Sequence, residues 1–201
     1  MKAFFKIIAY IFHPIFIPIY GCLIYFVVTK KYTSMEMKVG NLFPIFILTV
    51  VIPIICFLIM RNIGMISSVF MPTTKERKYP LYISIMLLFM IIYKVIPSQY
   101  TPELYYYFIG LILALSTSAV LLFVKYKTSI HMLGIGSLVM YLINLSIHFE
   151  INLALSLSIL ILFAGLIASS RLYFKAHTKL ELAVGLVIGI VTQFLTIPYW
   201  L

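Results

Sequence analysis

The chain has 201 residues, of which 64% are hydrophobic and only 10% are charged. This composition excludes an ordinary soluble domain and indicates an integral membrane protein. The formal net charge of +10 does not predict nucleic-acid binding, because the basic residues occur in short segments between apolar runs, where they suit anionic lipid headgroups. The expected partner is therefore the lipid bilayer and not a nucleic acid.

A helix that crosses the hydrocarbon core of a membrane needs about 20 apolar residues, and somewhat shorter helices are tolerated where the bilayer thins. Seven runs approach this length, so we predict an all-α, polytopic membrane helix bundle with six to seven transmembrane helices, forming a single domain over residues 1–201. The first run is longer than the core of a signal peptide and is expected to be retained. The runs are Phe4 to Val28, Leu42 to Met60, Leu81 to Ile96, Leu104 to Val124, Met132 to Ile147, Ile151 to Ala168 and Leu182 to Tyr199.

The first run contains two prolines that interrupt a helix. Pro14 and Pro18 cannot donate to the backbone ladder, so the helix over Phe4 to Val28 is expected either to be kinked or to lie partly in the membrane interface. His13 stands directly before the first proline. Its side chain either caps the broken helix, which is the favoured interpretation, or belongs to a functional site.

Two further patterns concern packing in the membrane. The run Tyr105-Tyr106-Tyr107 and the pair Tyr199-Trp200 are expected to lie at the membrane interface, where aromatic side chains gather. Gly185 and Gly189, four residues apart in the last run, are expected to allow close helix contact.

Three polar clusters separate the apolar runs: Lys75 to Pro80, Lys127 to His131 and Ser170 to Glu181. Two predicted spans lie between the first cluster and the second, and two more lie between the second and the third. Because two crossings return the chain to its starting side, all three clusters are expected at the same membrane surface. The N-terminus belongs to that side and the C-terminus to the opposite one.

The third cluster combines an arginine, a histidine and a carboxylate. Glu181 follows His177 by four residues, so on a helix the two side chains share a face. The carboxylate can then accept from one imidazole nitrogen and leave the other available, which is how a nucleophilic or basic histidine is oriented. Arg171 adds a permanent, forked positive charge suited to phosphate oxygens.

The other two clusters carry side chains of the same kinds. The middle cluster, Lys127-Thr128-Ser129-Ile130-His131, supplies a hydroxyl and an imidazole. The first cluster supplies Lys75 and Arg77 as candidate phosphate ligands, with Lys78 in reserve. Each cluster taken alone is typical of a solvated basic loop or of a histidine at a helix start.

Metal ligands are scarce in this chain. There is no aspartate, and the five glutamates are far apart, so a carboxylate-rich magnesium or calcium site is not expected. The four histidines are too scattered to suggest zinc. Any phosphate chemistry is therefore expected to need neither a metal nor a cofactor. The acids are Glu36, Glu76, Glu103, Glu150 and Glu181.

The third cluster resembles the third signature of the type 2 phosphatidic acid phosphatase superfamily. In both, Ser-Arg is followed by five residues, a histidine, three residues and an acid, which is usually aspartate in the family and is Glu181 here. Ser129 and His131 match the second signature, proline-serine-glycine-histidine, with Thr128 and Ile130 at the other two positions. Isoleucine in place of glycine argues against a close backbone approach to phosphate. The first cluster has cations before a proline, without the family spacing.

This resemblance implies a core of six membrane helices and an enzyme of the bacterial inner membrane. Such an enzyme removes phosphate, without a metal, from a lipid phosphate or a polyprenyl diphosphate. The resemblance makes His177, held by Glu181, the nucleophile that forms a phosphohistidine, and it makes His131 the acid and base on the leaving oxygen. The phosphate group would be bound by Arg171, Lys75, Arg77 and Ser129.

Other functions stay open at this point. The departures at Thr128, Ile130 and Glu181 fit a catalytically silent member that binds a lipid phosphate or a membrane partner protein. A channel or transporter has less support, because the polar residues lie in segments at one surface and not at mid-membrane. The excess of lysine and arginine on the cluster side favours a cytoplasmic site, whereas the family's bacterial members more often act on the outer side, so both orientations are kept.

Overall fold

The computed structural model describes residues 1–67, 71, 73–96 and 99–201, and among these it contains helices and no strand. The predicted all-α fold is confirmed. The elements are α1 (Lys2–Ile11), η1 (Pro14–Phe16), α2 (Ile17–Val28), α3 (Met35–Phe46), the π-helical turn η2 (Ile47–Val51), α4 (Ile52–Asn62), α5 (Thr74–Lys94), α6 (Pro102–Phe123), α7 (Ile130–His148), α8 (Ala154–Tyr173), α9 (Lys179–Phe194) and η3 (Ile197–Tyr199).

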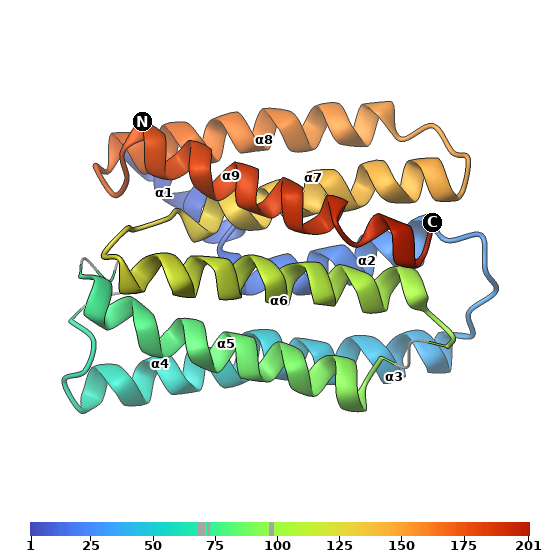
Figure 1. Ribbon diagram of the computed structural model, residues 1–201, viewed down its shortest axis with the longest axis horizontal. Helices are drawn as coiled ribbons and strands as arrows, with labels where there is room; N and C mark the ends of the chain where they lie inside the picture. The colour runs from blue at the N-terminus through green and yellow to red at the C-terminus, as the bar shows by residue number, and fades with distance from the viewer. Residues whose placement is uncertain (68–70, 72, 97–98) are drawn as a thin grey trace.

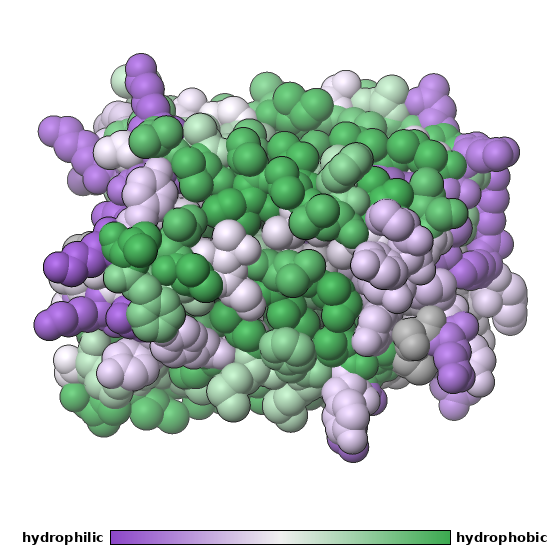
Figure 2. Space-filling view, in the orientation of Figure 1, coloured by the Kyte–Doolittle hydropathy of each residue, from purple (hydrophilic) through white to green (hydrophobic). Residues whose placement is uncertain are grey.

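The helices lie side by side, with an apolar band around their middle and hydrophilic residues at both ends (Figures 1 and 2). Within the described residues, six helical segments are long and apolar enough to cross a membrane. Helix α5 is not among them, because charged residues at both of its ends leave roughly 15 apolar residues, about 22 Å of helix. The predicted membrane bundle of six to seven helices is confirmed. The six segments are Lys2–Val28, Met35–Asn62, Pro102–Phe123, Ile130–His148, Ala154–Tyr173 and Lys179–Tyr199.

The predicted position of the three clusters at one end of the bundle is also confirmed. The N-terminus and the connections α4–α5, α6–α7 and α8–α9 lie at one end of the bundle, which we call the motif end, and the C-terminus lies at the other (Figure 1). Helix α5 runs between the two ends and supplies the crossing that parity requires. The expected connections between Asn62 and Tyr79 and between Pro97 and Glu103 include positions 68–70, 72, 97 and 98, which lie outside the described residues.

The first span is broken where the prolines predict it, between α1 and η1. Its backbone groups find other partners: the N–H of His13 donates to Tyr10 O at 3.2 Å, and Ile11 O accepts from the hydroxyl of Tyr20 at 2.9 Å. The carbonyl of Ala9 faces the ring of His131, with Nε2 at 3.3 Å. Side chains thus satisfy the carbonyls that the break releases, as a membrane interior requires.

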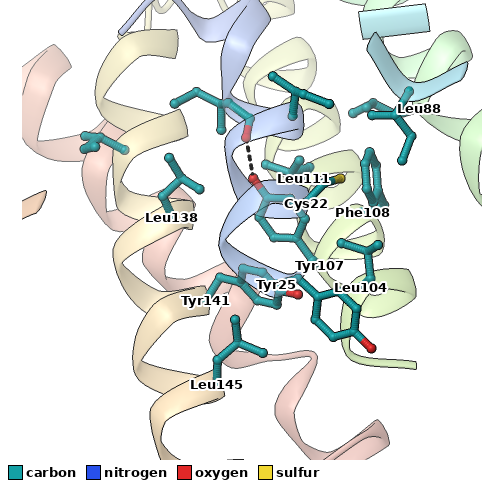
Figure 3. Packing of buried hydrophobic residues seen from close by; sticks show 14 of the residues in the cluster. Cys22, Tyr25, Leu88, Leu104, Tyr107, Phe108, Leu111, Leu138, Tyr141 and Leu145 are labelled. Carbon is teal, nitrogen blue, oxygen red and sulfur yellow. Dashed lines mark hydrogen bonds between the residues drawn. The ribbon is translucent and has the colours of Figure 1, made fainter. Parts of the chain in front are cut away.

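The buried core lies where α2, α6 and α7 meet (Figure 3). Tyr107 is fully buried there, stacks on Tyr141 with ring centroids 4.3 Å apart, and donates its hydroxyl to Ile17 O at 2.8 Å. The expectation that Tyr107 lies at the membrane interface is therefore wrong. Trp200 is also buried, against Tyr141, whereas Tyr199 is exposed.

A separate polar cluster fixes the opposite end of the bundle. The side chain of Glu103 is fully buried, and its Oε1 lies 2.6 Å from Nζ of Lys31 and 3.1 Å from Nε2 of His148. The hydroxyl of Tyr25 donates to its Oε2 at 3.4 Å. This cluster ties α2, α6 and α7 together on the side away from the predicted site.

Helices α7 and α9 pack closely because of the two glycines singled out in the sequence. A methyl group on Gly189 would collide with the backbone carbonyl of Leu133, and one on Gly185 would meet the backbone of Ser129. Backbone atoms cannot move aside as a flexible side chain can, so the contact requires glycine at both positions.

We expect Gly189→Ala to lower the free energy of unfolding by about 1–3 kcal/mol, the cost of overpacking a well-packed contact. Gly165, on the exposed side of α8, has no atom within 4 Å of an added methyl group and serves as the matched control. Gly165→Ala should be neutral or stabilise by up to about 1 kcal/mol. Thermal unfolding of the purified variants in detergent measures both, and equal midpoints for the two would contradict the packing argument.

Candidate functional site

A cavity of about 630 Å³ opens near the motif end, between α1, η1, α4, α5, α6 and the first turn of α7. Its polar lining combines cations with imidazoles and contains no carboxylate among the described residues. The rest of the wall is mainly aliphatic and aromatic. The cationic and imidazole side chains that line it are Lys2, Lys6, His13, Arg77, His131, Arg171 and His177.

The structure brings together four of the seven predicted site residues. Arg77, His131, Arg171 and His177 line the cavity although they come from α5, α7, α8 and the α8–α9 connection. Lys75, Ser129 and Glu181 are not among the lining residues. The chemical roles assigned to all seven stay predictions.

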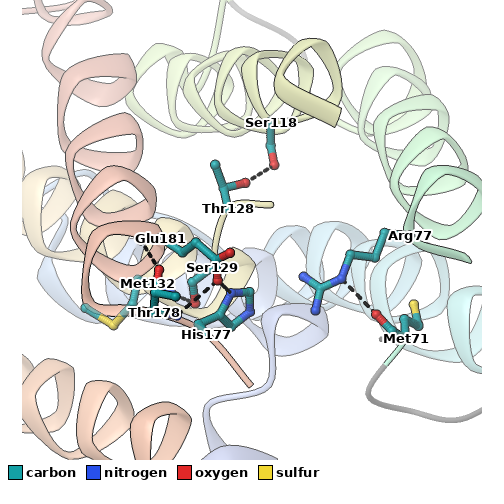
Figure 4. Close-up of polar contacts among 9 residues, drawn as sticks. All are labelled: Met71, Arg77, Ser118, Thr128, Ser129, Met132, His177, Thr178 and Glu181. Carbon is teal, nitrogen blue, oxygen red and sulfur yellow. Dashed lines mark hydrogen bonds and ion pairs between the residues drawn. The ribbon is translucent and has the colours of Figure 1, made fainter. Parts of the chain in front are cut away.

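The local fold of the α8–α9 connection holds His177. Thr178 is the N-cap of α9, and its hydroxyl accepts from the N–H of Glu181 while Oε2 of Glu181 accepts from the N–H of Thr178. The same Oε2 lies 2.9 Å from Nδ1 of His177 (Figure 4). The expected pairing is present, but the carboxylate reaches the ring through a capping box and not along a helix face, since His177 precedes the helix.

This pairing sets the proton positions on His177. A carboxylate accepts, so Nδ1 carries the hydrogen and Nε2 keeps its lone pair in the neutral ring. The side chain is only 4% exposed. Burial, and then the positive charges of Arg77 and Lys127, lower the pKa of His177, and the carboxylate of Glu181 offsets part of that effect. The ring at the cavity is therefore a neutral imidazole with an available nitrogen.

His131 occupies the second position of α7 and is held by the backbone of α1. Its Nε2 donates to the Ala9 carbonyl, so its Nδ1 is left to exchange protons with a ligand. The hydroxyl of Ser129 caps the same helix by accepting from the N–H of Met132 at 3.5 Å. Ser129 is fully buried, which does not support its predicted role in positioning phosphate.

Arg171 lies in the last turn of α8, so the Ser170–Arg171 pair is helical and does not belong to a loop. Arg171 is only 6% exposed, and its Nε has no hydrogen-bond partner among the described residues. None of the ion pairs that the described residues form includes it. Beside it, the hydroxyl of Ser170 donates to Phe5 O at 2.8 Å and fixes α8 against α1. A buried positive charge therefore lines the cavity, and no carboxylate in the described part of the chain pairs with it.

The first cluster is helical as well, in contrast to the predicted loop. Arg77 lies in the first turn of α5, donates through Nε to Met71 O at 2.9 Å, and points its guanidinium towards His177 (Figure 4). Lys75 is exposed and lies outside the cavity lining. Glu76 accepts from the hydroxyl of Thr73, the N-cap of this helix. Of the two proposed cations, the structure places Arg77 at the site.

The two departures from the family's second signature have structural roles. Thr128 forms a short hydrogen bond to Ser118 of α6, and both residues line the cavity (Figure 4). Ile130 is the first residue of α7 and also lines the cavity. It packs against the small apolar cluster formed by Leu81, Ala119 and Leu122. Its backbone is helical, so no glycine is required at this position.

Two lining residues come from irregular segments: His13, for which the sequence left a functional role open, and Thr49, which the sequence did not indicate. His13 caps η1, as favoured, since its Nδ1 accepts from the N–H of Ile15 at 3.4 Å, but it also lines the cavity. Thr49, in the π-helical turn η2, is 5% exposed, and its hydroxyl has no partner among the described residues. The His-Pro pair signalled the first, whereas no local pattern marks Thr49.

Comparison with protein-family models, with curated proteins and with solved structures gives no match to this chain. Among the described residues, no group of three or more histidine, cysteine or acidic side chains is arranged to hold a metal ion. The reaction that this site could support is therefore inferred from the side chains at the cavity. Two arginines, a carboxylate-held imidazole and a second imidazole can bind an anion and exchange a proton with it.

The lowered pKa of His177 predicts an acid-sensitive fold. Below the ordinary histidine value of 6.5, the unfolded chain binds a proton that the folded protein does not bind, so stability falls as the pH falls. His177→Gln removes this group and keeps a donor for Glu181. The wild type should therefore lose more of its thermal midpoint than His177→Gln between about pH 7.5 and about pH 5. Equal losses would show that the folded protein protonates His177 as readily as the unfolded chain.

Proposed function

We propose that this chain is a metal-independent membrane lipid phosphatase, which hydrolyses a lipid phosphate or a polyprenyl diphosphate through a phosphohistidine intermediate. The observation that carries the proposal is the buried charge of Arg171 at a cavity that no carboxylate of the described residues lines. A buried charge is costly unless it is paired, and among the described residues no acid pairs with Arg171. An anionic ligand supplies the missing partner.

The side chains that line the cavity favour an amphiphilic anion over a small one. Cations and imidazoles occupy one part of the wall, and side chains of α4, α5 and α6 provide an apolar remainder. A phosphate group suits the arginines, whereas an acyl or prenyl chain suits the apolar wall. The apolar wall includes Leu48, Phe57, Leu81, Leu87, Leu88 and Leu115.

The side chains at the cavity support a two-step reaction. Nε2 of His177 attacks phosphorus, and the bond between phosphorus and the leaving oxygen breaks. Arg171 and Arg77 balance the charge on the phosphoryl oxygens. Nδ1 of His131 takes a proton from the protonated phosphate group of the substrate and passes it to the leaving oxygen, and the same nitrogen then takes a proton from the water that hydrolyses the phosphohistidine.

The motif resemblance adds the cellular setting. It implies the inner membrane of a bacterium, and the site lies at the membrane surface that also holds the N-terminus. Both orientations of that surface stay compatible with the proposal.

One observation favours a second function, the binding of a lipid phosphate without turnover. The residues that depart from the family pattern fill structural roles, and Ser129, which matches it, is buried away from the cavity lining. A catalytically silent protein would keep the arginines that bind phosphate but would not hydrolyse the lipid phosphate. Turnover separates the two functions.

The direct test is phosphate release by the purified protein from a panel of lipid phosphates and diphosphates in the presence of EDTA. The proposed enzyme should remain active with the chelator and be inhibited by vanadate, which mimics five-coordinate phosphorus. Activity that is lost with EDTA and restored by magnesium would reject the phosphohistidine route. Tight binding without any release would establish the second function.

Substitution of His177 and of His131 should affect phosphoenzyme formation differently. His177→Ala removes the nucleophile and should leave no covalent phosphoenzyme with any substrate. His131→Ala should lose most lipid turnover, because a lipid alkoxide needs a proton to leave, yet it should still be phosphorylated by nitrophenyl phosphate, whose leaving group needs none.

The measurement is an acid-labile, base-stable phosphate label followed by mass spectrometry. In His131→Ala the label should accumulate on His177, because water is no longer activated for the second step. Loss of labelling to the same extent in both variants would show that the roles are wrongly assigned. His148→Ala, at the far end of the bundle, is the control and should label as the wild type does.

A further inference from the structure

The break in the first span places a third histidine at the cavity. His13 lines it together with His131, and the two rings meet edge to face with centroids 5.4 Å apart. The position is fixed by the backbone, since His13 is the N-cap of η1 and Pro14 is the first residue of that turn. A side chain held in this way keeps its direction without help from a ligand.

The hydrogen bonds assign the Nε2–H tautomer to both rings, but each ring uses a different nitrogen inside the protein. Nδ1 of His13 accepts from the N–H of Ile15, so the neutral ring carries its hydrogen on Nε2. No hydrogen bond from that nitrogen occurs within the described part of the chain. His131 instead uses its own Nε2 on Ala9 O. His13 thus offers a donor to the cavity, whereas His131 offers an acceptor.

A second polar group from an irregular segment lies in the same cavity. The hydroxyl of Thr49 is buried and without a partner among the described residues, and its turn η2 packs against η1. Proteins rarely bury polar groups without partners, so unmet donors at a cavity wall indicate a polar ligand. A phosphate group can accept more hydrogen bonds than one arginine donates, which leaves room for a neutral donor beside Arg171.

We propose that His13 is a substrate-binding residue whose Nε2–H donates to a phosphate oxygen of the bound lipid. The inference rests on the proposed function, because it names a further ligand of the same phosphate. For a lipid monophosphate the acceptor is the phosphate that His177 attacks. For a lipid diphosphate it is the second phosphate, which leaves with the lipid.

Two substitutions separate binding from capping. His13→Asn keeps a side-chain oxygen at the N-cap, where asparagine is a preferred residue, but is too short to present the imidazole donor to the cavity. His13→Ala removes both the cap and the donor. If His13 only caps η1, His13→Asn should bind substrate as the wild type does. If His13 binds phosphate, both variants should bind it about 10- to 100-fold more weakly, the usual loss for a hydrogen bond to a charged group.

The experiment measures equilibrium binding to the full-length protein in nanodiscs. The probes are a long-chain alkylphosphonate, the matching alkyl bisphosphonate and the alkyl alcohol of the same length, none of which His177 can dephosphorylate. His148→Asn, at the far end of the bundle, controls for loss of a histidine in general. A larger loss for the bisphosphonate places His13 at the second phosphate, and an equal loss places it at the first.

Three outcomes decide the proposal. Weaker phosphonate binding by His13→Asn, at an unchanged thermal midpoint, supports it. Unchanged binding by His13→Asn, with stability and binding lost together in His13→Ala, overturns it and leaves His13 a cap. A wild-type protein that binds the alcohol as tightly as the phosphonate would reject the proposed function itself, before any variant is compared.

Discussion

A membrane interior requires that every backbone polar group find a partner, and the broken first span meets this requirement with side chains from distant helices. Pro14 ends α1 early, and the carbonyls that it releases accept from Tyr20 and His131. The bond from His131 draws the start of α7 to α1, while the hydroxyl of Ser170 fixes α8 to Phe5. The helix break thus joins α7 to α1 beside the cavity, and the separate bond from Ser170 joins α8 to the same helix.

The same arrangement buries the positive charge of Arg171 at the cavity, where it lowers the stability of the protein alone and favours the binding of an anion. Arg171 is buried without a carboxylate from the described residues, whereas the buried Glu103 at the opposite end has Lys31 and His148 as partners. The buried charge of Glu103 is thus neutralised within the protein, whereas no described acid neutralises that of Arg171. An unpaired buried charge lowers stability and is kept where a bound anion compensates it.

Hydropathy and parity predicted the helical spans and the shared surface of the three clusters, because both follow from the bilayer and need no tertiary detail. They could not predict where helices begin: charged residues extend α5 back to Thr74, beyond the apolar run that starts at Leu81. Motif spacing selected Arg171, His131 and His177, which line the cavity, but it also selected Ser129, which is a buried helix cap. The aromatic run predicted an interface position for Tyr107, which is a core residue. The second role of His13 depends on a contact 118 residues away, with the ring of His131, which no local pattern contains.

The central claim, that the charge of Arg171 is matched by a lipid phosphate group, can be tested by thermal unfolding of the protein in nanodiscs. We expect an alkylphosphonate to raise the midpoint of the wild type well above the effect of the matching alcohol, because a ligand that binds only the folded state stabilises it. Arg171→Met, which removes the unpaired charge at similar volume, should be at least as stable as the wild type without ligand and should not respond to the phosphonate. An Arg171→Met protein that is stabilised by the phosphonate as strongly as the wild type would contradict this account.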